Sequence, residues 1–449
     1  MTFKKGVKLM ANTQQKSFFE RAFKLKENGT NVRTEVLAGI TTFMTMAYII
    51  FVNPSILSDA GMPFNGVFIA TIAGAILGTV MMALLTNYPF ALASGMGLNA
   101  FFAYSVVIGM GVSWQTALGI VFIEGIIFIV LSVTPVRKMI VNSIPMSLKT
   151  GISSGIGLFI AFIGLQNAGI VVADPATLVR MGDLFAGPAL IALLGLIITG
   201  ILHALRVKGA LLLGIIIATI LGLFNGVTPT PEGVVALPRM ADWSQVLFQL
   251  DIRSAFNIGM IGVLISFLFV DLFDTAGTLV GVSQQAGYLK EDGSLPKADR
   301  ALLADAIATT GGAVFGTSTV TTYVESASGV SEGGRTGLTG IVVAILFFLS
   351  LFFQPIIAIV PGAATAPALI IVGVMMLSNI RSIKWEDFTE VFPAFVAMIV
   401  MPLTYSISNG IALGFITYPL IKLFTGKGKE VHWLVYVLCA LFIVYFIWL

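Results

Sequence analysis

Charged residues are scarce in this chain. Only 10% of its 449 residues are Asp, Glu, Lys or Arg, while 57% are hydrophobic and the mean hydropathy is +0.98. A soluble domain carries roughly 25% charged residues, so an unusually large soluble core is the only soluble alternative. Apolar runs recur from end to end and are long enough to cross a bilayer as helices. The short alternating segments of a membrane β-barrel are missing. The sequence therefore predicts an all-α polytopic protein of the lipid bilayer.

The residues of most metal and catalytic sites are also nearly absent. The single cysteine, Cys439, excludes an intrachain disulfide and a Cys-based metal site. The two histidines, His203 and His432, lie near the ends of predicted helices, where an interfacial role suffices. The glycine-rich "GMGLNA" lacks the βαβ context of a nucleotide loop. We therefore expect no enzyme activity, no metal or organic cofactor, and no nucleic-acid partner.

Fourteen membrane spans can be read from the apolar runs. They lie at roughly 36–57, 65–85, 90–108, 114–133, 150–171, 186–204, 209–224, 255–281, 301–316, 317–331, 337–353, 363–379, 388–404 and 408–424. If the basic N-terminal tail (1–33) is cytoplasmic, only three of the 25 Lys and Arg residues fall in outer loops, namely Arg180, Arg239 and Arg253. This bias follows the positive-inside rule. It predicts a multi-pass protein of the cytoplasmic membrane. A final apolar segment (427–449) is either a fifteenth span or lies along the inner surface.

The two halves of the chain resemble each other. With seven spans in 34–225 and seven in 254–426, corresponding helices run in opposite directions. "GALLLGIIIATILGLFNG" at 209–226 is similar to "GIALGFITYPLIKLFTG" at 410–426, and each is the seventh span of its half. The odd number of spans in each half and these similarities predict a 7+7 inverted repeat, an architecture of many secondary transporters.

Two of the spans are poor helix formers, and each is third in its half. One reads "YPFALASGMGLNAFFAYSVV" (88–107), and the other reads "FGTSTVTTYVESASGVSEGG" (315–334). A run of β-branched residues favours extended structure, so we expect a short extended segment followed by a half-helix in each. Such backbone is tolerated at membrane depth only where it is buried in protein or lines a cavity. Free backbone groups and half-helix N-termini would make a polar substrate site.

The eighth span carries acids inside an apolar run. Asp271, Asp274, Thr275 and Thr278 follow one another at i, i+3, i+4 and i+7, which places them on one helix face. We expect this face to point at the cavity between the broken spans, opposite Glu325. Ionisable residues at this depth are functional hypotheses by default, and the alternative is a structural carboxylate tied to hydroxyls and backbone.

Two further acids lie in predicted spans. Glu124 in "VFIEGII" is the one acid on its helix, and we expect a packing role. Asp305 in "LLADAIATTGG" lies early in a small-residue helix, where capping or bracing of the neighbouring broken span is the favoured interpretation.

Four long motifs carry a family resemblance. They are "NGTNVRTEVLAGITTFMTMAYIIFVNP", "ASGMGLNAFFAY", "FLFVDLFDTAGTLVG" and "FGTSTVTTYVESASGVSEGGRTGLTG". They resemble the guanine/hypoxanthine permeases, the azaguanine-like branch of the nucleobase–cation symporter (nucleobase–ascorbate transporter) superfamily. The resemblance covers nearly all of the chain. It implies a uracil-permease-like fold of 7+7 inverted repeats, with a core domain from spans 1–4 and 8–11 and a gate domain from spans 5–7 and 12–14. It also implies proton-coupled purine uptake, in many members by homodimers.

The resemblance assigns site residues as well. The implied purine-binding residues are Asp271, Glu325, Asn99, Gly97, Ala100, Thr275 and Ser326. The implied coupling residues, with H+ as the coupling ion, are Glu325, Asp274 and Asp271. A register shift on the eighth span would exchange the two aspartates.

The chain departs from the uracil and xanthine branches in two places. It reads Glu325-Ser326-Ala327-Ser328 where they have Glu or Gln followed by Asn-x-Gly, and it lacks the eighth-span histidine of uracil carriers. We therefore expect a purine substrate and a proton carried by a carboxylate. An anion transporter of the same fold is the alternative, but such a carrier is expected to place Lys or Arg at the site, and none of the 25 lies in the predicted core cavity. A channel is disfavoured by a single midplane site with acids.

Overall fold

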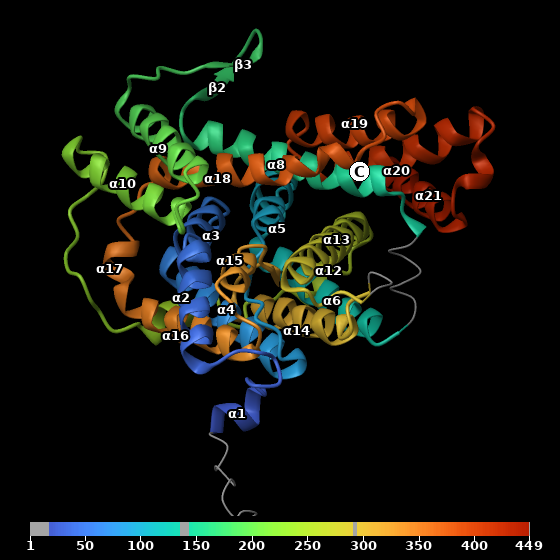
Figure 1. Ribbon diagram of the computed structural model, residues 1–449. Coiled ribbons are helices and arrows are strands. Elements are labelled where there is room, and N and C mark those ends of the chain that lie inside the picture. Colours follow the sequence, from blue (N-terminus) through green and yellow to red (C-terminus); the bar gives the residue numbers. More distant parts are fainter. Residues whose placement is uncertain (1–17, 135–142, 291–293, 449) are drawn as a thin grey trace, which may run out of the picture.

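The computed structural model describes residues 18–134, 143–290 and 294–448. Figure 1 shows a protein built almost entirely of helices. The described residues also form two short two-stranded sheets. Within this described part, nine helices are long and apolar enough to cross a membrane, and four shorter apolar helices accompany them. The chain is therefore a helical membrane protein, as the composition predicted.

The elements of the first half follow the predicted spans. They are α1 (Phe18–Phe23), α2 (Val32–Met46), α3 (Ile49–Asp59), α4 (Phe64–Thr86), β1 (Leu92–Ser94), α5 (Met96–Ala100), a π-helix (Phe101–Gly109), α6 (Trp114–Ser132), α8 (Met146–Asn167), β2 (Val171–Asp174), β3 (Leu178–Met181), α9 (Gly187–Ala204) and α10 (Ala210–Phe224). The segment that joins the halves contains two short helices, α11 (Met240–Ser244) and α12 (Ile252–Ala255).

The elements of the second half also follow the predicted spans. Its elements are α13 (Ile261–Ala286), α14 (Ala298–Phe315), β4 (Val320–Thr322), α15 (Ser326–Ser331), α16 (Gly337–Ser350), α17 (Gln354–Ile357), α18 (Gly362–Leu377), α19 (Phe388–Leu403), α20 (Ile407–Phe424) and α21 (Trp433–Trp448). A helix, or a strand followed by a helix, occupies each of the fourteen predicted ranges. The 7+7 inverted arrangement of these elements remains a prediction. The terminal helix α21 packs on α20, where Phe442 stacks on Phe415 with ring centroids 5.6 Å apart.

Two predicted boundaries were wrong by several residues. The eighth span was expected at 255–281, but α13 begins at Ile261 because α12, capped by the Asp251 side chain, and a 3-10 turn come first. It ends where Gly287 adopts a left-handed conformation with φ 71°, which favours glycine. The fifth span was expected to reach residue 171, but α8 stops at Asn167, and Gly169 with φ 69° turns the chain into the unpredicted hairpin of β2 and β3.

The two broken spans meet in a buried sheet. Strand β1 pairs antiparallel with β4, with Leu92 opposite Thr322 and Ser94 opposite Val320. Both expected extended segments are therefore present, and pairing satisfies backbone groups that would be costly to leave free inside a membrane. Because the strands are antiparallel, α5 and α15 begin at opposite ends of this sheet. Three residues of strand separate those ends by roughly 10 Å.

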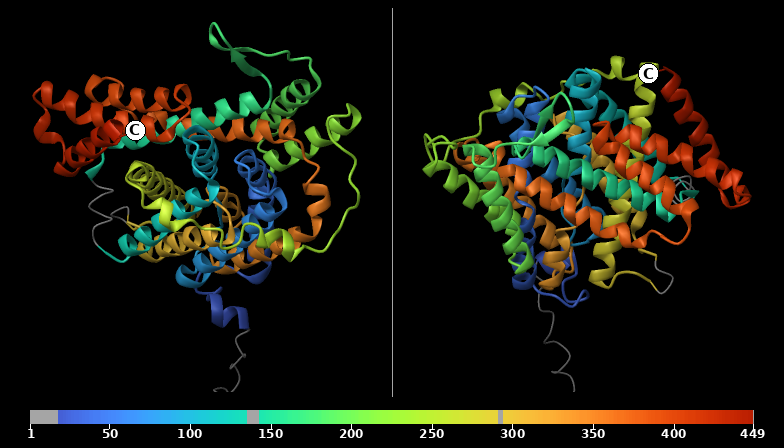
Figure 2. Two further views of the ribbon diagram at one scale, coloured as in Figure 1. Left: turned by 180° about the vertical axis from the view of Figure 1, so that it is seen from behind. Right: turned by 90° about the horizontal axis from the view of Figure 1, so that it is seen from above.

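The helices form two packed groups. In one, which we call the acid-bearing group, α4 packs on α14 and α16, α6 packs on α14 and α13, and α2 packs on α15 and α16. In the other, which we call the covering group, α8 packs on α18, α19 and α20, while α9 and α10 pack on α18. Figure 1 and the reverse view in Figure 2 show α8 and α18 to α20 side by side in one layer above the acid-bearing group.

Candidate functional site

The acids of α13 do not share one environment. Asp271 and Thr275 are completely buried, whereas Asp274 and Thr278 are half-buried. Residues at i and i+4 point in nearly the same direction on a helix, and i+3 lies on the other side of i. The predicted polar face is therefore split, with Asp271 and Thr275 turned into the acid-bearing group and Asp274 turned toward the broken tenth span.

Asp305 holds the strand of the tenth span. Its carboxylate accepts hydrogen bonds from the backbone N–H of Thr322 at 2.9 Å, the Thr322 hydroxyl at 3.1 Å and the Thr275 hydroxyl at 2.9 Å. The first two donors belong to β4 and the third to α13. The expected bracing role of Asp305 is confirmed, and it extends to the acid-bearing helix.

Asp271 faces the same interior. One of its oxygens accepts a hydrogen bond from the Thr309 hydroxyl of α14 at 3.3 Å, and the other has no donor among the described residues. It also interacts with Glu124 of α6. The next residue on α6, Gly125, permits a close approach to α14, because a Cβ there would lie 2.9 Å from the backbone nitrogen of Thr310.

Glu325 lies at the start of α15, directly after the strand, and is half-buried. Its carboxylate accepts a hydrogen bond from the Tyr48 hydroxyl at 2.8 Å and interacts electrostatically with Asp274. The Tyr48 ring lies 6.5 Å from that of Tyr323, whose hydroxyl donates to the Ser94 carbonyl. The structure therefore brings Glu325 and Asp274 together, as expected for one of the two aspartates. It adds two tyrosines that the sequence analysis missed.

Asn99 lies at the opposite end of the sheet. Its side-chain oxygen accepts a hydrogen bond from the Ser318 hydroxyl, and its Nδ2 is buried with no acceptor among the described residues. Ala100 is buried beside it, and Gly97 packs so closely on α8 that a Cβ would lie 2.6 Å from Ile156. The unpaired amide of Asn99 has a donor available for an acceptor on a ligand.

Ser326 belongs to the Glu325 end of the sheet. Its hydroxyl accepts a hydrogen bond from the backbone N–H of Ala91 at 2.9 Å, which ties α15 to the residue before β1. The sheet thus separates two groups of predicted residues. Glu325, Ser326 and the neighbouring Asp274 lie at one end, and Asn99 and its neighbours lie at the other.

One cation approaches α13 from the covering group. The Lys149 ammonium of α8 lies 5.8 Å from the centroid of the Phe273 ring. The expectation that no Lys or Arg lies in the core cavity remains a prediction, because this contact is with Phe273 and not with a predicted site residue. The groups next to Glu325 itself are a tyrosine and an aspartate.

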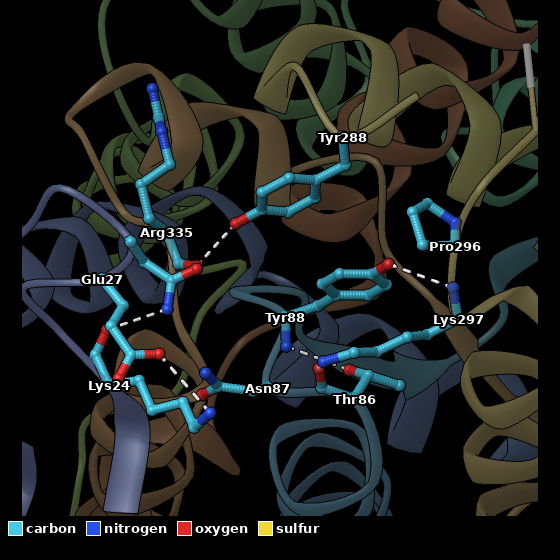
Figure 3. A pocket seen from close by; sticks show the side chains of 10 residues that line it. Lys24, Glu27, Thr86, Asn87, Tyr88, Tyr288, Pro296, Lys297 and Arg335 are labelled. Carbon is cyan, nitrogen blue, oxygen red and sulfur yellow. Dashed lines mark hydrogen bonds and ion pairs between the residues drawn. The ribbon is translucent and has the colours of Figure 1, made fainter. Parts of the chain in front are cut away.

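Two cavities lie elsewhere. One has a volume of about 340 Å³ and lies beside the N-terminal segment. Figure 3 shows Tyr88 and Tyr288 stacked within it, with their ring centroids 4.9 Å apart, and Lys297 reaching across Tyr88. The other, of about 560 Å³, lies between Tyr418 and the loop before α21. Neither cavity is lined by a predicted site residue.

Comparison with known proteins identifies the family. Residues 33–413 match the Permease family (Xan_ur_permease). The guanine/hypoxanthine permease PbuO of Bacillus subtilis is 47% identical over 427 residues, which cover 94% of this chain and 99% of PbuO. The adenine permease AdeP of Escherichia coli is 46% identical over 437 residues, which cover 96% of each chain.

The fold has a solved counterpart. The transmembrane domain of a cyanobacterium bicarbonate transporter, BicA, aligns with a TM-score of 0.64 over 84% of this chain and 97% of that one. At 16% identity this likeness concerns the fold alone. The family match and the relatives agree over almost the whole length, and they show that this chain belongs to the Permease family and is a multi-pass membrane transporter.

Proposed function

We propose that this protein imports purine nucleobases, hypoxanthine and guanine first and adenine as a further candidate, by proton symport. The observation that carries the proposal is the Glu325 carboxylate beside the β1–β4 sheet, where it accepts a hydrogen bond from the Tyr48 hydroxyl at 2.8 Å. Relatives that are 46–47% identical over nearly the full chain are guanine/hypoxanthine and adenine permeases. Intramembrane acids of this kind are rare, and in transporters they mark substrate and proton pathways.

The chemistry of the site suits a purine. A purine base is flat and largely neutral, and presents N–H donors and nitrogen or carbonyl acceptors along its edges. The Glu325 carboxylate can accept N–H groups, and the unpaired Asn99 amide can donate to an acceptor. When the base enters a dry site, each of its polar groups loses its hydrogen bonds to water and needs a partner from the protein. We assign the acid face of the site to Asp274 and Glu325, and a supporting position to Asp271, which corresponds to the exchange of aspartates that the sequence allowed.

The two packed groups support an alternating-access mechanism. We propose that the acid-bearing group is the core domain of spans 1–4 and 8–11, and that the covering group is the gate domain of spans 5–7 and 12–14, in a 7+7 inverted repeat. The outer contact joins Tyr104 of the π-helix to Asn167 of α8, with a hydrogen bond of 3.0 Å. A second contact joins Lys208 to Glu332 on the side of the N-terminal segment. Rocking of one group against the other would break one contact while the other persists.

Coupling is assigned to Glu325 with Asp274. A carboxylate that accepts purine N–H groups loses part of that capacity once protonated, so substrate and proton binding depend on each other at Glu325. We further propose that the protein lies in the cytoplasmic membrane with its N-terminus in the cytoplasm, and that it forms a homodimer.

An anion transporter of the same fold is the alternative, because BicA is a bicarbonate transporter. The hydroxyls of Tyr48 and Tyr323 near Glu325 already donate their hydrogen bonds to Glu325 and to the Ser94 carbonyl. The Asp274 carboxylate, which interacts with Glu325, would repel an anion. This composition favours the purine.

Uptake into proteoliposomes tests the proposal. Labelled hypoxanthine should accumulate when the outside is made acidic, and it should equilibrate without accumulation when a protonophore removes the gradient. Unlabelled guanine should compete, whereas bicarbonate and sulfate should not. Uptake of bicarbonate without uptake of hypoxanthine would establish the alternative.

A further inference from the structure

Among the described residues, Glu124 is a buried acid of the acid-bearing group that lacks hydrogen-bond donors. It lies on α6, is 0% exposed, and neither of its carboxyl oxygens has a hydrogen-bond partner among the described residues. The ionisable groups with which it interacts are Asp271 of α13 and Asp305 of α14. An isolated ionised carboxylate in such surroundings carries a large desolvation cost. The proposed function gives Glu124 no part.

The hydrogen-bond donors in this interior are unevenly distributed. Asp305 accepts three bonds, from two groups of Thr322 and one of Thr275, and is therefore well suited to stay ionised. Asp271 has one donor, the Thr309 hydroxyl, whose single proton is also within reach of the Val320 carbonyl at 3.1 Å. Glu124 has none. The supply of donors thus decreases in the order Asp305, Asp271, Glu124.

Two carboxylates cannot hydrogen bond to each other, because an ionised carboxyl group is an acceptor only. The Glu124 and Asp271 side chains nevertheless lie within hydrogen-bonding range of each other. One proton between them turns a repulsive contact into a hydrogen bond and satisfies a free oxygen of Asp271. This arrangement is known for carboxyl pairs that share a site.

We propose that Glu124 and Asp271 form a buried proton-binding site, in which the proton resides on Glu124 and is donated to the Asp271 carboxylate, while Asp305 stays ionised. A bound metal is the other occupant that a group of acids suggests. No set of three or more His, Cys, Asp or Glu side chains in the described ranges has the geometry to hold one. A proton requires only the two facing carboxyl groups.

The site is enclosed by the protein, so its proton is expected to stay bound throughout transport. Glu124 and Asp271 are completely buried, whereas Asp274 and Glu325 are half-buried and interact electrostatically. The groups that face the pair from the neighbouring elements are Asp305 of α14 and, beyond Asp271, Asp274 of α13. We infer that Asp274 and Glu325 exchange protons during transport and that the Glu124 proton stays in place.

Glutamine at position 124 can mimic this state, because its amide N–H is a permanent donor toward Asp271. Glu35 offers a matched control. It is equally buried, but its carboxylate accepts bonds from the backbone N–H groups of Arg335 at 2.9 Å and Thr339 at 3.2 Å and from the Thr339 hydroxyl at 2.6 Å. Such a carboxylate has its acceptor oxygens satisfied by donors of the protein and needs no additional proton.

Infrared spectroscopy of the purified protein in lipid tests the site without any substrate. The difference between wild type and Glu124→Gln should contain the C=O stretch of a protonated carboxyl group, and this band should persist in mildly alkaline buffer. The difference between wild type and Glu35→Gln should instead contain carboxylate bands. A carboxylate band for Glu124→Gln, or failure of that variant to fold, would overturn the proposal, because the amide supplies the same donor.

A transport assay distinguishes a proton that stays bound from one that is transported with the substrate. This second experiment rests on the proposed function. Glu124→Gln should accumulate hypoxanthine under an imposed proton gradient to the same extent as wild type. If a folded variant still binds hypoxanthine but no longer accumulates it, the Glu124 proton takes part in coupling. That result would overturn the proposal that this proton stays in place. If wild type itself takes up no hypoxanthine, the proposed function fails, while the infrared result still decides whether the pair holds a proton.

Discussion

Asp305→Asn should destabilise the protein and weaken purine binding together. The carboxylate of Asp305 accepts three hydrogen bonds at 2.9–3.1 Å, two from Thr322 of β4 and one from Thr275 of α13. Asparagine has the same shape but keeps one acceptor oxygen and turns an N–H₂ group toward a donor. The substitution therefore loosens the strand that precedes Glu325 and leaves the covering group untouched.

The expected magnitude follows from these three bonds. A hydrogen bond to a charged group contributes about 1.5–3 kcal/mol, and a neutral one about 0.5–1.5 kcal/mol. One bond is lost and two become neutral, while the uncharged amide avoids part of the desolvation cost of a buried charge. We expect the free energy of unfolding to fall by about 2–4 kcal/mol. If about 1.4 kcal/mol of this reaches the Glu325 site, purine affinity falls tenfold.

Thermal unfolding and hypoxanthine binding in detergent measure both effects. Thr322→Val is the matched control, because it removes the hydroxyl donor at 3.1 Å and keeps the backbone donor. It should cost only about 1 kcal/mol and should have the smaller effect on binding. An unchanged unfolding midpoint for Asp305→Asn, or a larger loss for Thr322→Val, would refute the bracing role of this carboxylate.

Three further substitutions probe other parts of the chain. Glu325→Gln keeps the shape and removes the titration, so accumulation against a gradient should be abolished; concentrative uptake by this variant would transfer the coupling role to Asp274. Asn99→Ala removes an amide donor and should change the ranking of guanine, hypoxanthine and adenine in competition assays, and an identical ranking would exclude Asn99 from the substrate site. Outside the spans, hydrogen bonds from Thr389 and the Lys427 ammonium hold the pKa of Asp387 well below its usual range. A lowered pKa stabilises the fold above roughly pH 4, and this contribution is lost as the pH falls through the folded-state pKa. Asp387→Asn should therefore flatten the acidic fall in melting temperature, and identical pH profiles would contradict this account.

Much of the architecture could be predicted because it depends on local properties of the chain. Apolar length alone located the helices, since a bilayer accepts only segments whose backbone groups are satisfied internally. The β-branched run "TSTVTT" could be recognised as extended, because such side chains lose rotamer freedom in a helix. The two strands were therefore expected, although their pairing with each other was not. The ends of helices were less accurate, because a turn such as that at Gly169 depends on one residue.

The environment of each acid could be predicted only in part. The spacing of Asp271, Asp274 and Thr275 indicates a common face on α13, but the direction of each side chain depends on the rotation of the helix against α6 and α14. A difference of one turn separates a group that meets Glu124 from a group that meets Glu325. No signal in the sequence of α6 indicated that Glu124 would face another carboxyl group.

The sequence by itself determined that this chain is a helical membrane protein with two broken spans and with acids at membrane depth, because these features follow from composition, period and rotamer preference. Only the tertiary structure decided which groups meet. Tyr48 lies in the apolar stretch "AYIIFV", where nothing distinguishes an aromatic ring that faces lipid from one whose hydroxyl donates to Glu325. The contacts of Tyr48 with Glu325 and of Glu124 with Asp271 join helices that are far apart in the chain, and Asp305 joins α14 to the elements on either side of it. They depend on the packing of α3, α6, α13 and α14 around one small sheet, and long-range packing of this kind leaves no periodic pattern in a single sequence.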